Sequence, residues 1–532
     1  VIQWDKDDLD AVGLMKIDVL ALGMLSAVRR AFELANRHRP RERPLALWSI
    51  PREDAATFEM ISRADTVGVF QIESRAQMSM LPRLKPRSFY DLVIEIAIVR
   101  PGPIQGEMVH PYLKRRQGLE PEEYPNEEIR RVLGRTLGVP IFQEQVIELA
   151  MVAAGFSAGE ADQLRRALGA WRKRGTLEDF RKKLFDGMTE RGFTADFADR
   201  VYRQILGFGE YGFPESHSAS FAVIAYASAW LKCHEPVAFY CALLNSQPMG
   251  FYGPSQLVQD ARRHGVVVRP PCVLASDAES TLEPLAEKGG AAETHALRLG
   301  LDRIHGLSAG GIERLLVARG RAPFRDVADC VRRGRLDARD RRALAQSGAF
   351  AALEENRHAA HWAATGIPDD LALEKNLPAD RAVGEPAVEL PAPDTAQTIL
   401  ADYQRLGLSL NGHPLALLRE RLRRLRLRRS DELKTRHDGA HTRYCGLVTM
   451  RQRPGTAKGT VFLTLEDEVG TVNVIVWPDR VAEYQQVVVG ARLLEVRGQW
   501  QHREGVAHLV ARVLVDHSDW LGRLPARSRD FH

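Results

Sequence analysis

Polar residues suited to phosphate chemistry gather in one short stretch. The chain reads Tyr211-Gly212-Phe213-Pro214-Glu215-Ser216-His217-Ser218 and continues into an apolar run from Ala219 to Leu231. The first turn of a helix exposes unpaired backbone N–H groups and the positive end of the helix dipole, so this arrangement favours an anion such as phosphate. A second interpretation stays open, in which Ser216 or Ser218 merely caps the helix.

Cations cluster in an earlier segment with helical spacing. Leu164-Arg165-Arg166-Ala167-Leu168-Gly169 leads into Trp171-Arg172-Lys173-Arg174. One guanidinium group can bind two phosphate oxygens at once, so these residues are candidates for contacting a polyphosphate. A basic surface helix would explain the same residues.

One carboxylate lies within an apolar stretch that is typical of a buried strand. Met15-Lys16-Ile17-Asp18-Val19-Leu20 places Asp18 beside Lys16, and such a pair can hold a divalent metal over a phosphate. The alternative is that Asp18 is a cap or an ion-pair partner. The acidic residues that precede it have the spacing of a polar loop: Asp5, Asp7, Asp8 and Asp10.

The composition limits the classes of fold and site that the chain can have. A chain of 532 residues with 45% hydrophobic and 27% charged residues predicts about three or four globular domains. Its 5 cysteines form no CxxC pair, which argues against a zinc site or a disulfide scaffold and fits a reducing cytoplasm. The apolar run ending at Leu231 is too short to span a membrane, and no signal peptide is visible.

Positive charge is concentrated although the formal net charge is only +5. Positions 419 to 429 hold seven arginines, Arg423 and Arg424 among them, against one glutamate. Such clustering indicates a polyanionic partner, with a solvated basic helix face as the alternative.

The spacing of apolar residues divides the chain. Residues 20 to 250 are predicted to be mainly helical, and residues 304 to 353 form short helices. Between them, Val266-Val267-Val268 and Leu297-Arg298-Leu299-Gly300-Leu301 look like strands on either side of an acidic loop. Prolines from 367 to 393 predict a linker.

Two later segments predict contact with nucleic acid. Residues 304–312 resemble a helix-hairpin-helix loop, in which Gly306, Ser308 and Gly310 would offer backbone N–H groups to DNA phosphates. A plain helical turn is the alternative, because Ser308 stands where the second glycine is usual. After Thr442 the pattern alternates with period two, which predicts an oligonucleotide-binding (OB) barrel. Its candidate stacking residues, each of which also suits the core, are Tyr444, Phe462, Trp477 and Trp500.

Six segments in this order resemble the bacterial C-family DNA polymerases, the family of the DNA polymerase III alpha subunit. They are Gly68–Ser74, Arg100-Pro101-Gly102-Pro103, Phe142-Gln143-Glu144-Gln145, Leu164–Ala167, Tyr211–Ser218 and Gly412-His413-Pro414. The strings from Gly212 to His217 and from Leu244 to Tyr252 resemble the error-prone, damage-associated branch.

The resemblance implies an α+β multidomain fold. We expect the end of the palm at 1–23, mainly helical fingers at 24–285, a helix-hairpin-helix region at 286–366, a linker and basic helix at 367–440, an OB barrel at 441–518 and a tail at 519–532. The chain starts at Val1 without an initiator methionine, so we expect a C-terminal fragment of a longer polymerase.

The resemblance also assigns roles to residues. Asp18 matches the third of three palm aspartates that bind two Mg²⁺ ions, and is the expected catalytic and metal-binding residue. The expected nucleotide-binding residues are Lys16, Arg100, Arg165, Arg166, His217 and Ser218. The expected DNA-binding residues are Gly306, Ser308, Gly310, Arg423, Arg424 and Trp477.

The implied function is template-directed DNA synthesis in error-prone translesion synthesis and DNA repair. The partners would be primer-template DNA, dNTPs and a sliding clamp reached indirectly through accessory damage-tolerance proteins, with no membrane. Because the other two aspartates lie upstream in the family, we expect this chain alone to be inactive. The alternatives are a replicative alpha subunit and a non-catalytic DNA-binding protein.

Overall fold

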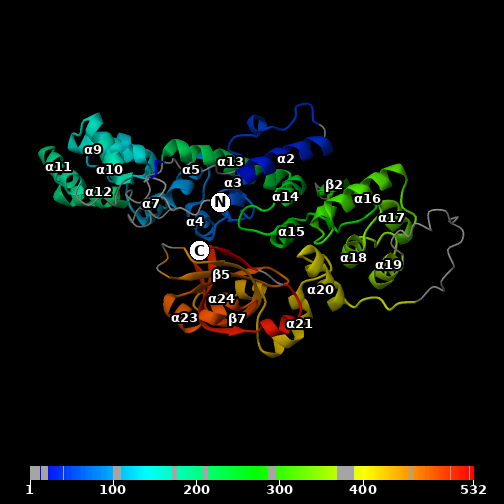
Figure 1. The fold of residues 1–532 in the computed structure, drawn as a ribbon. Helices are drawn as coiled ribbons and strands as arrows, with labels where there is room; N and C mark the ends of the chain where they lie inside the picture. The colour runs from blue at the N-terminus through cyan, green and yellow to red at the C-terminus, as the bar shows by residue number, and fades with distance from the viewer. Residues whose placement is uncertain are drawn as a thin grey trace.

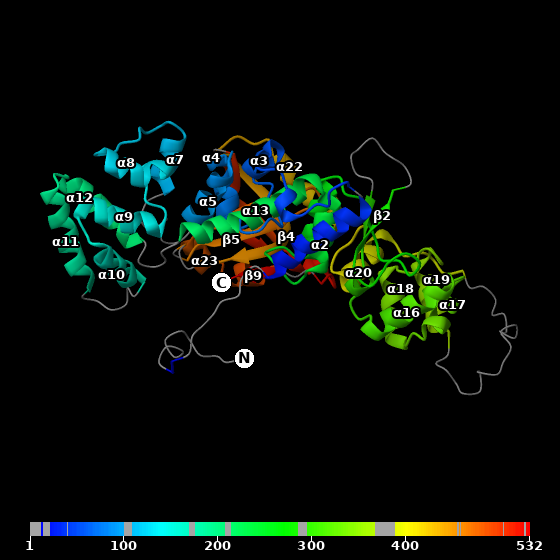
Figure 2. The same cartoon turned by 90° about the horizontal axis from the view of Figure 1, so that it is seen from above.

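The structure is a computed structural model that places a helical layer over a β-barrel, with a further helical module at each end (Figures 1 and 2). The residues that it describes are 12–13, 22–39, 41–99, 109–169, 176–207, 214–285, 295–367, 389–454, 457, 459–503, 505–525 and 528–531.

The central layer contains the helices α2 (Leu22–His38), α3 (Ala55–Ser62), α4 (Arg75–Leu84), α5 (Phe89–Ile98), α13 (Glu215–His234), α14 (Pro236–Asn245) and α15 (Pro254–Arg263). Side-chain caps fix where several of them begin. Asp54 accepts from Thr57 N–H at the start of α3, and Ser88 and Asp91 form a capping box on α5.

The module at one end contains α7 (Val109–Arg116), α8 (Glu127–Leu133), α9 (Gln143–Ala154), α10 (Ala158–Gly169), α11 (Thr176–Glu190) and α12 (Ala195–Gly207). The helical pattern predicted for residues 20 to 250 is therefore confirmed. The serine-cap interpretation of α13 is wrong. The helix begins at Glu215 after Pro214, with no side-chain cap, so Ser216 and Ser218 already lie inside its first turns.

A small sheet leads to the module at the other end. Strands β1 (Val268–Arg269) and β3 (His295–Arg298) are parallel, and β2 (Thr281–Pro284) pairs antiparallel with β3. β2 lies within what was predicted to be a loop, because its four residues include a proline and a glutamate. The helices of the module are α16 (Ala309–Arg321), α17 (Val327–Gly334), α18 (Ala338–Ser347) and α19 (Arg357–Thr365).

The C-terminal part is a closed barrel, which confirms the predicted fold. Its strands are β4 (His441–Gln452), β5 (Val461–Glu466), β6 (Thr471–Val476), β7 (Leu493–Arg503) and β8 (Val506–Asp516). The sheet runs β5-β6-β8-β7-β4, and β4 also pairs with β5 to close it. β6 and β8 are parallel, and α23 (Pro478–Glu483) and α24 (Gln485–Gly490) connect β6 to β7, as in an OB fold.

A glycine allows a bulge in the barrel. The β7–β8 register shifts between Arg497 and Gly498, and a Cβ at Gly498 would stand 1.9 Å from the carbonyl oxygen of Val510. Only glycine permits so close an approach, so the bulge that curves the barrel depends on this residue.

Three groups of buried apolar residues hold these parts. One extends through the helices and the small sheet, the second fills the barrel, and the third joins α20 (Thr395–Leu406) and α21 (Pro414–Arg424) to the barrel. The short helices α22 (Ser430–Lys434) and η7 (Ser518–Leu521) and the strand β9 (Arg529–Phe531) complete this end. Among the described residues, no helix has the length and apolar character needed to cross a bilayer. Most of the predicted linker, residues 368–388, lies outside the described part.

Candidate nucleotide and nucleic-acid sites

Ser218 anchors α13 to α5. Its side chain is fully buried, and its hydroxyl donates to the carbonyl oxygen of Val93. We expected Ser218 to contact a nucleotide, but in this position it orients the helix and faces away from solvent.

The first turn of α13 already faces protein carboxylates. Glu144, at the start of α9, accepts a 3.0 Å hydrogen bond from the backbone N–H of Glu215. The Glu215 carboxylate in turn accepts from the Tyr90 hydroxyl at 2.9 Å and from Arg135 at 3.2 Å. Burial and this bond raise the pKa of Tyr90. The N–H of Glu215 is therefore already paired, and a phosphate that binds this group has to displace Glu144.

His217 connects two of the sequence motifs. Its half-buried ring lies 4.4 Å from the ring of Phe221, which contacts Phe70 at 5.3 Å. Phe70 belongs to the Gly68–Ser74 segment, and its N–H donates to Ser228 of α13. The fold thus brings these distant segments to one place, with an imidazole at its edge.

The remaining nucleotide-binding candidates are either outside the described residues or described only by their backbone. Lys16, Asp18 and Arg100 are outside the described residues. Arg165 and Arg166 belong to α10, and the described part of these two residues is the backbone. Since α10 packs against α9, the arginine helix belongs to the module that supplies Glu144.

A buried ion cluster joins α13, α14 and α15. The Lys232 ammonium, which is 1% exposed, lies 2.9 Å from both Asp65 and Asp260. His264 contacts Asp65 at 2.7 Å, and the Tyr240 hydroxyl donates to Asp260 at 2.7 Å. The donor set resembles a metal site, but the ammonium already occupies the position between the carboxylates, so the cluster fits a structural role.

The titration of this cluster follows from its contacts. Burial would raise the pKa of Asp65, but the hydrogen bond from His264 and the charge of Lys232 outweigh burial and hold the pKa well below its usual value. The bond to Asp65 raises the pKa of His264.

A second group of possible metal ligands is Asp54, Cys233 and His234. The carboxylate oxygen of Asp54 that contacts His234 at 2.8 Å also accepts from the N–H and the hydroxyl of Thr57. Burial raises the pKa of the Cys233 thiol, which disfavours the thiolate that a metal needs. Asp54 is therefore used as the cap of α3, and the group fits a structural role.

The hairpin loop that precedes α16 is held by a residue of the next helical hairpin, which consists of α17 and α18. Ser308 caps α16 by accepting from Gly311 N–H, while the fully buried Asp340 of α18 accepts from both the N–H and the hydroxyl of Ser308 at 2.8 Å. A Cβ at Gly311 would stand 2.1 Å from the Asp340 carboxylate, so glycine is required there. The Ser308 hydroxyl is used internally, which leaves the backbone at Gly306 and Gly310 as the expected phosphate contacts.

The loop between α17 and α18 repeats this geometry. Arg335 and Gly306 both have positive φ, at 46° and 92°, and each precedes a leucine and then a capping residue. Arg314 of α16 donates to the carbonyl oxygen of Gly334, while Arg339 of α18 donates to that of Gly306. The loop of each hairpin is thus held by the second helix of the other hairpin. We did not predict this repeat from the sequence, because Arg335-Leu336-Asp337 lacks the glycines of the first loop.

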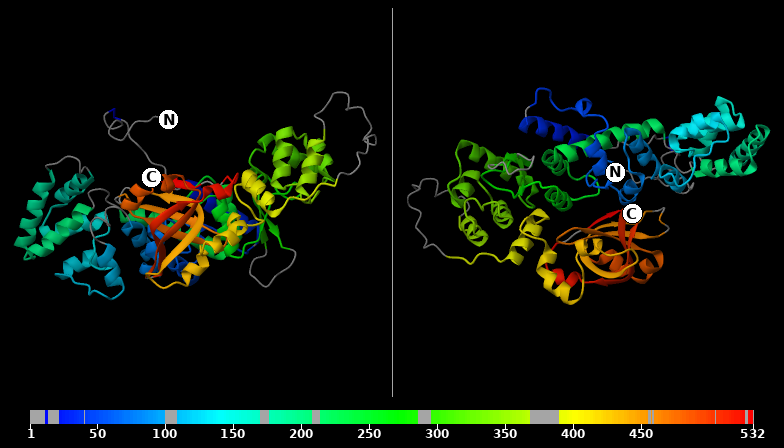
Figure 3. Two further views of the ribbon diagram at one scale, coloured as in Figure 1. Left: turned by 90° about the horizontal axis from the view of Figure 1, so that it is seen from below. Right: turned by 180° about the vertical axis from the view of Figure 1, so that it is seen from behind.

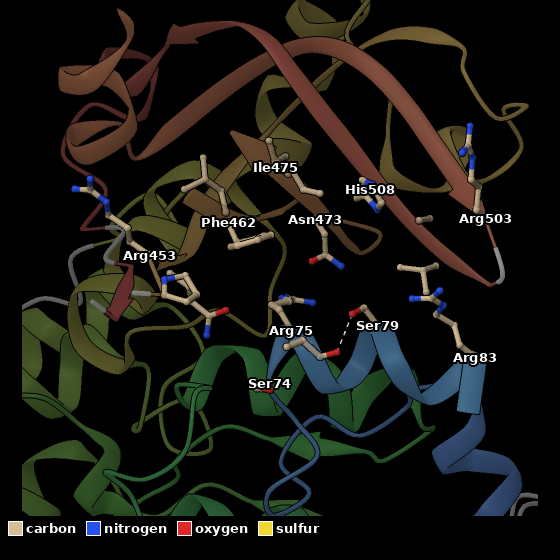
Figure 4. Close-up of a pocket in the computed structure, with 17 residues that line it drawn as sticks. Ser74, Arg75, Ser79, Arg83, Arg453, Phe462, Asn473, Ile475, Arg503 and His508 are labelled. Atoms are coloured by element: carbon tan, nitrogen blue, oxygen red, sulfur yellow. Dashed lines mark hydrogen bonds between the residues drawn. The ribbon is translucent and has the colours of Figure 1, made fainter. Parts of the chain in front are cut away.

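A groove of about 750 Å³ separates α4 from one face of the barrel (Figure 4). Phe462 and Ile475 of β5 and β6 point from the barrel toward α4, as does Asn473. Cationic side chains line the groove from both sides: Arg75, Arg83, Arg453 and Arg503. An aromatic ring among guanidinium groups on this face of an OB barrel has the chemistry of a single-strand binding site.

The other predicted stacking residues differ in their exposure to solvent. Tyr444 and Trp500 are buried in the barrel core, so they are not available to bases. Trp477 is 50% exposed where α23 begins, but it does not line the groove.

The basic run at 419–429 is partly structural. Arg419 is buried and forms a double hydrogen bond with Glu468, and Arg421 stacks on Trp520 at 3.8 Å. Arg423 and Arg424 are exposed, and α21 lies at the end of the barrel away from α4 (Figure 1). The two arginines are therefore separate from the groove.

Comparisons with known proteins agree with this architecture. Residues 24–192 match the bacterial DNA polymerase III alpha subunit finger domain, and residues 265–360 match a helix-hairpin-helix motif. In these two regions the chain is therefore similar to bacterial DNA polymerase III alpha subunits and to helix-hairpin-helix proteins.

The relatives are proteins named error-prone DNA polymerase. Those of Alkalilimnicola ehrlichii, Methylococcus capsulatus and Pseudomonas fluorescens are 57%, 56% and 54% identical to this chain over its whole length. The match covers 51% of each of these relatives, so the chain spans about half of their length.

Proposed function

We propose that the chain is the fingers, hairpin and barrel part of a template-directed DNA polymerase that acts in error-prone translesion synthesis and DNA repair. The observation that carries the proposal is the identity of 54–57% along the whole chain to proteins named error-prone DNA polymerase. Because these relatives are named for the error-prone branch, they favour it over a replicative alpha subunit.

The nucleotide would lie beside the start of α13. His217 supplies a ring at the edge of the aromatic contacts with Phe221 and Phe70. Arg165, Arg166, Lys16 and Arg100 are proposed to contact the triphosphate. Ser218 is proposed as a positioning residue, since its hydroxyl is bonded to Val93.

Asp18 is proposed as a ligand of a two-Mg²⁺ site that residues outside this chain complete. In such a site the ions activate the primer 3′-hydroxyl and stabilise charge on the phosphates. Without the other ligands, the chain alone would bind DNA but not extend a primer.

DNA would meet two further surfaces. The paired hairpin loops are proposed to contact the phosphates of the duplex, and the groove between α4 and the barrel to hold single-stranded template. The exposed Arg423 and Arg424 would add a non-specific contact. We further propose a cytoplasmic location and indirect recruitment to the sliding clamp; a tight complex of purified clamp with this chain would contradict that route.

The test is primer extension by the full-length protein. Asp18→Asn should abolish extension and leave primer-template binding within about twofold, because only the metal ligand changes. Retained extension would disprove the metal assignment. Extension past an abasic site by the unmodified protein separates the error-prone from the replicative reading, and absence of all nucleotide incorporation would favour a non-catalytic DNA-binding protein.

A further inference from the structure

A tryptophan projects from the surface between α2 and α3. The short helix η1 (Leu47–Ser49) exposes Trp48 at 90% and Leu47 at 46%. Figure 3 shows this segment, which follows α2, on the side of the helical layer away from the barrel. Burying a tryptophan is worth several kcal/mol, on the order of 25 cal/mol per Å², and within the described residues Trp48 contributes almost none of this to the fold.

The turn that carries Trp48 is rigidly held. On one side, the Asn36 side chain of α2 forms two hydrogen bonds with the backbone of Leu45, at 2.9 and 2.7 Å. Within the turn, Ser49 Oγ accepts from Ala46 N–H and donates to the Ala46 carbonyl oxygen.

The far side of the turn is fixed as well. The Tyr226 hydroxyl of α13 donates to the carbonyl oxygen of Pro51 at 2.7 Å and accepts from the N–H of Asp54 at 2.8 Å. An exposed tryptophan on a fixed backbone loses little conformational entropy on binding, which is the property of an interface anchor.

The surroundings of Trp48 carry more positive than negative charge. Residues 37–54 hold five arginines against Glu42, Glu53 and Asp54. Arg41 pairs with Glu235, while Arg37, Arg43 and Arg52 are exposed. The complementary surface is therefore an apolar pocket with carboxylates at its rim.

We propose that the Trp48 turn docks into such a pocket on the part of the full-length protein that lies outside this chain. The length of the relatives supports this occupant, because about half of each lies outside the match, which is enough chain to form a domain with such a pocket. A convex apolar knob fits a concave protein surface, whereas nucleic acid that binds by stacking is held in a groove, and none of the described pockets includes Trp48.

The test places a benzoylphenylalanine photo-crosslinker at position 48 of the full-length protein and maps the products by mass spectrometry. We expect crosslinks to an acidic peptide outside the sequence printed here, at about tenfold higher yield than from the same group at position 362. Trp362 is the matched control, since it is 56% exposed on α19. Crosslinks confined to residues 1–532, crosslinks to a second copy or to added primer-template, or none at all, would overturn the proposal.

A second measurement does not depend on the crosslinker. Trp48→Ala should raise the rate of limited proteolysis of the full-length protein about tenfold, which corresponds to roughly 1.4 kcal/mol. The same substitution should leave the proteolysis of the isolated chain unchanged, because Trp48 makes little contact there. Equal effects on both proteins would show that Trp48 acts within this chain and would contradict the proposal.

Discussion

Asp340 accepts two 2.8 Å hydrogen bonds from Ser308, one from the backbone N–H and one from the hydroxyl. The two residues belong to different hairpins, so the carboxylate fixes one phosphate-contacting loop by means of the next. Replacing Asp340 with alanine leaves the Ser308 N–H without its acceptor. We expect a loss of roughly 1–3 kcal/mol of stability and weaker binding to duplex DNA.

The matched control for this substitution is Asp326→Ala, which removes the cap of α17 without touching Ser308. It should cost about 1 kcal/mol and leave DNA affinity unchanged. Thermal unfolding and fluorescence anisotropy with a labelled duplex measure the two quantities. Equal DNA affinity in both variants would show that the Ser308 loop does not need Asp340.

Glu95 predicts an unusual dependence of stability on pH. It is fully buried in α5 with no hydrogen-bond partner for its carboxyl oxygens in the described structure, and burial raises its pKa well above the usual value. Since the folded state retains a proton that the unfolded state loses near pH 4.5, this group makes stability fall as pH rises. Glu95→Gln should therefore stabilise the protein by roughly 1–3 kcal/mol at pH 8 and have little effect at pH 4.

Chemical denaturation at both pH values measures this difference. The exposed Glu148 of α9 supplies the control substitution Glu148→Gln, for which no pH-dependent gain is expected. A Glu95→Gln variant that is equally or less stable than the parent at pH 8 would contradict the buried-acid interpretation.

Lys232 neutralises the buried carboxylate of Asp260 and the half-buried one of Asp65, so its removal should be costly. Lys232→Met removes the ammonium that Asp65 and Asp260 share, and we expect a loss of about 3–5 kcal/mol at pH 7. The lowered pKa of Asp65 means that its contribution is present above about pH 4 and is lost as pH falls toward the folded-state pKa. The loss caused by Lys232→Met should accordingly shrink in acid.

The surface pair of Lys183 and Glu160 is the comparison for Lys232. Lys183→Met should change stability by less than about 1 kcal/mol, because exposed ion pairs contribute little. Urea unfolding at pH 7 and pH 3.5 distinguishes the two. Similar costs for both lysines would show that the cluster is not an essential ion network.

The groove between α4 and the barrel predicts how the chain binds single strands. Phe462→Ala should weaken binding of a labelled oligothymidylate by about 1–3 kcal/mol if the ring stacks on a base. Arg453→Ala should reduce the slope of log affinity against log salt by about 0.7. Arg423→Ala on α21 is the control for position, and if it has the larger effect, the single strand binds elsewhere.

The sequence predicts this architecture well where a local pattern is typical of one kind of structure. The period-two pattern of the segments that form β5 and β6 predicts strands, and these strands pair with other strands of the same barrel, so the pattern is enough to predict the barrel. It does not show that Glu144 would face the start of α13, because that contact joins residues 71 positions apart. Nor does it reveal that Tyr444 and Trp500 fill the core while Phe462 lines the groove, since alternation defines two faces but not which one is covered.

The closed barrel has a consequence for the order in which the chain folds. β4 begins at His441 and pairs with β7, which ends at Arg503, while nearly all of the first core cluster lies before Leu408. During synthesis the helical part can therefore complete its core before the barrel has all its strands. The groove beside α4 needs both parts, so it can form only once the barrel strands are present and the Arg75–Thr464 and Gln259–Glu466 hydrogen bonds join them to the helices.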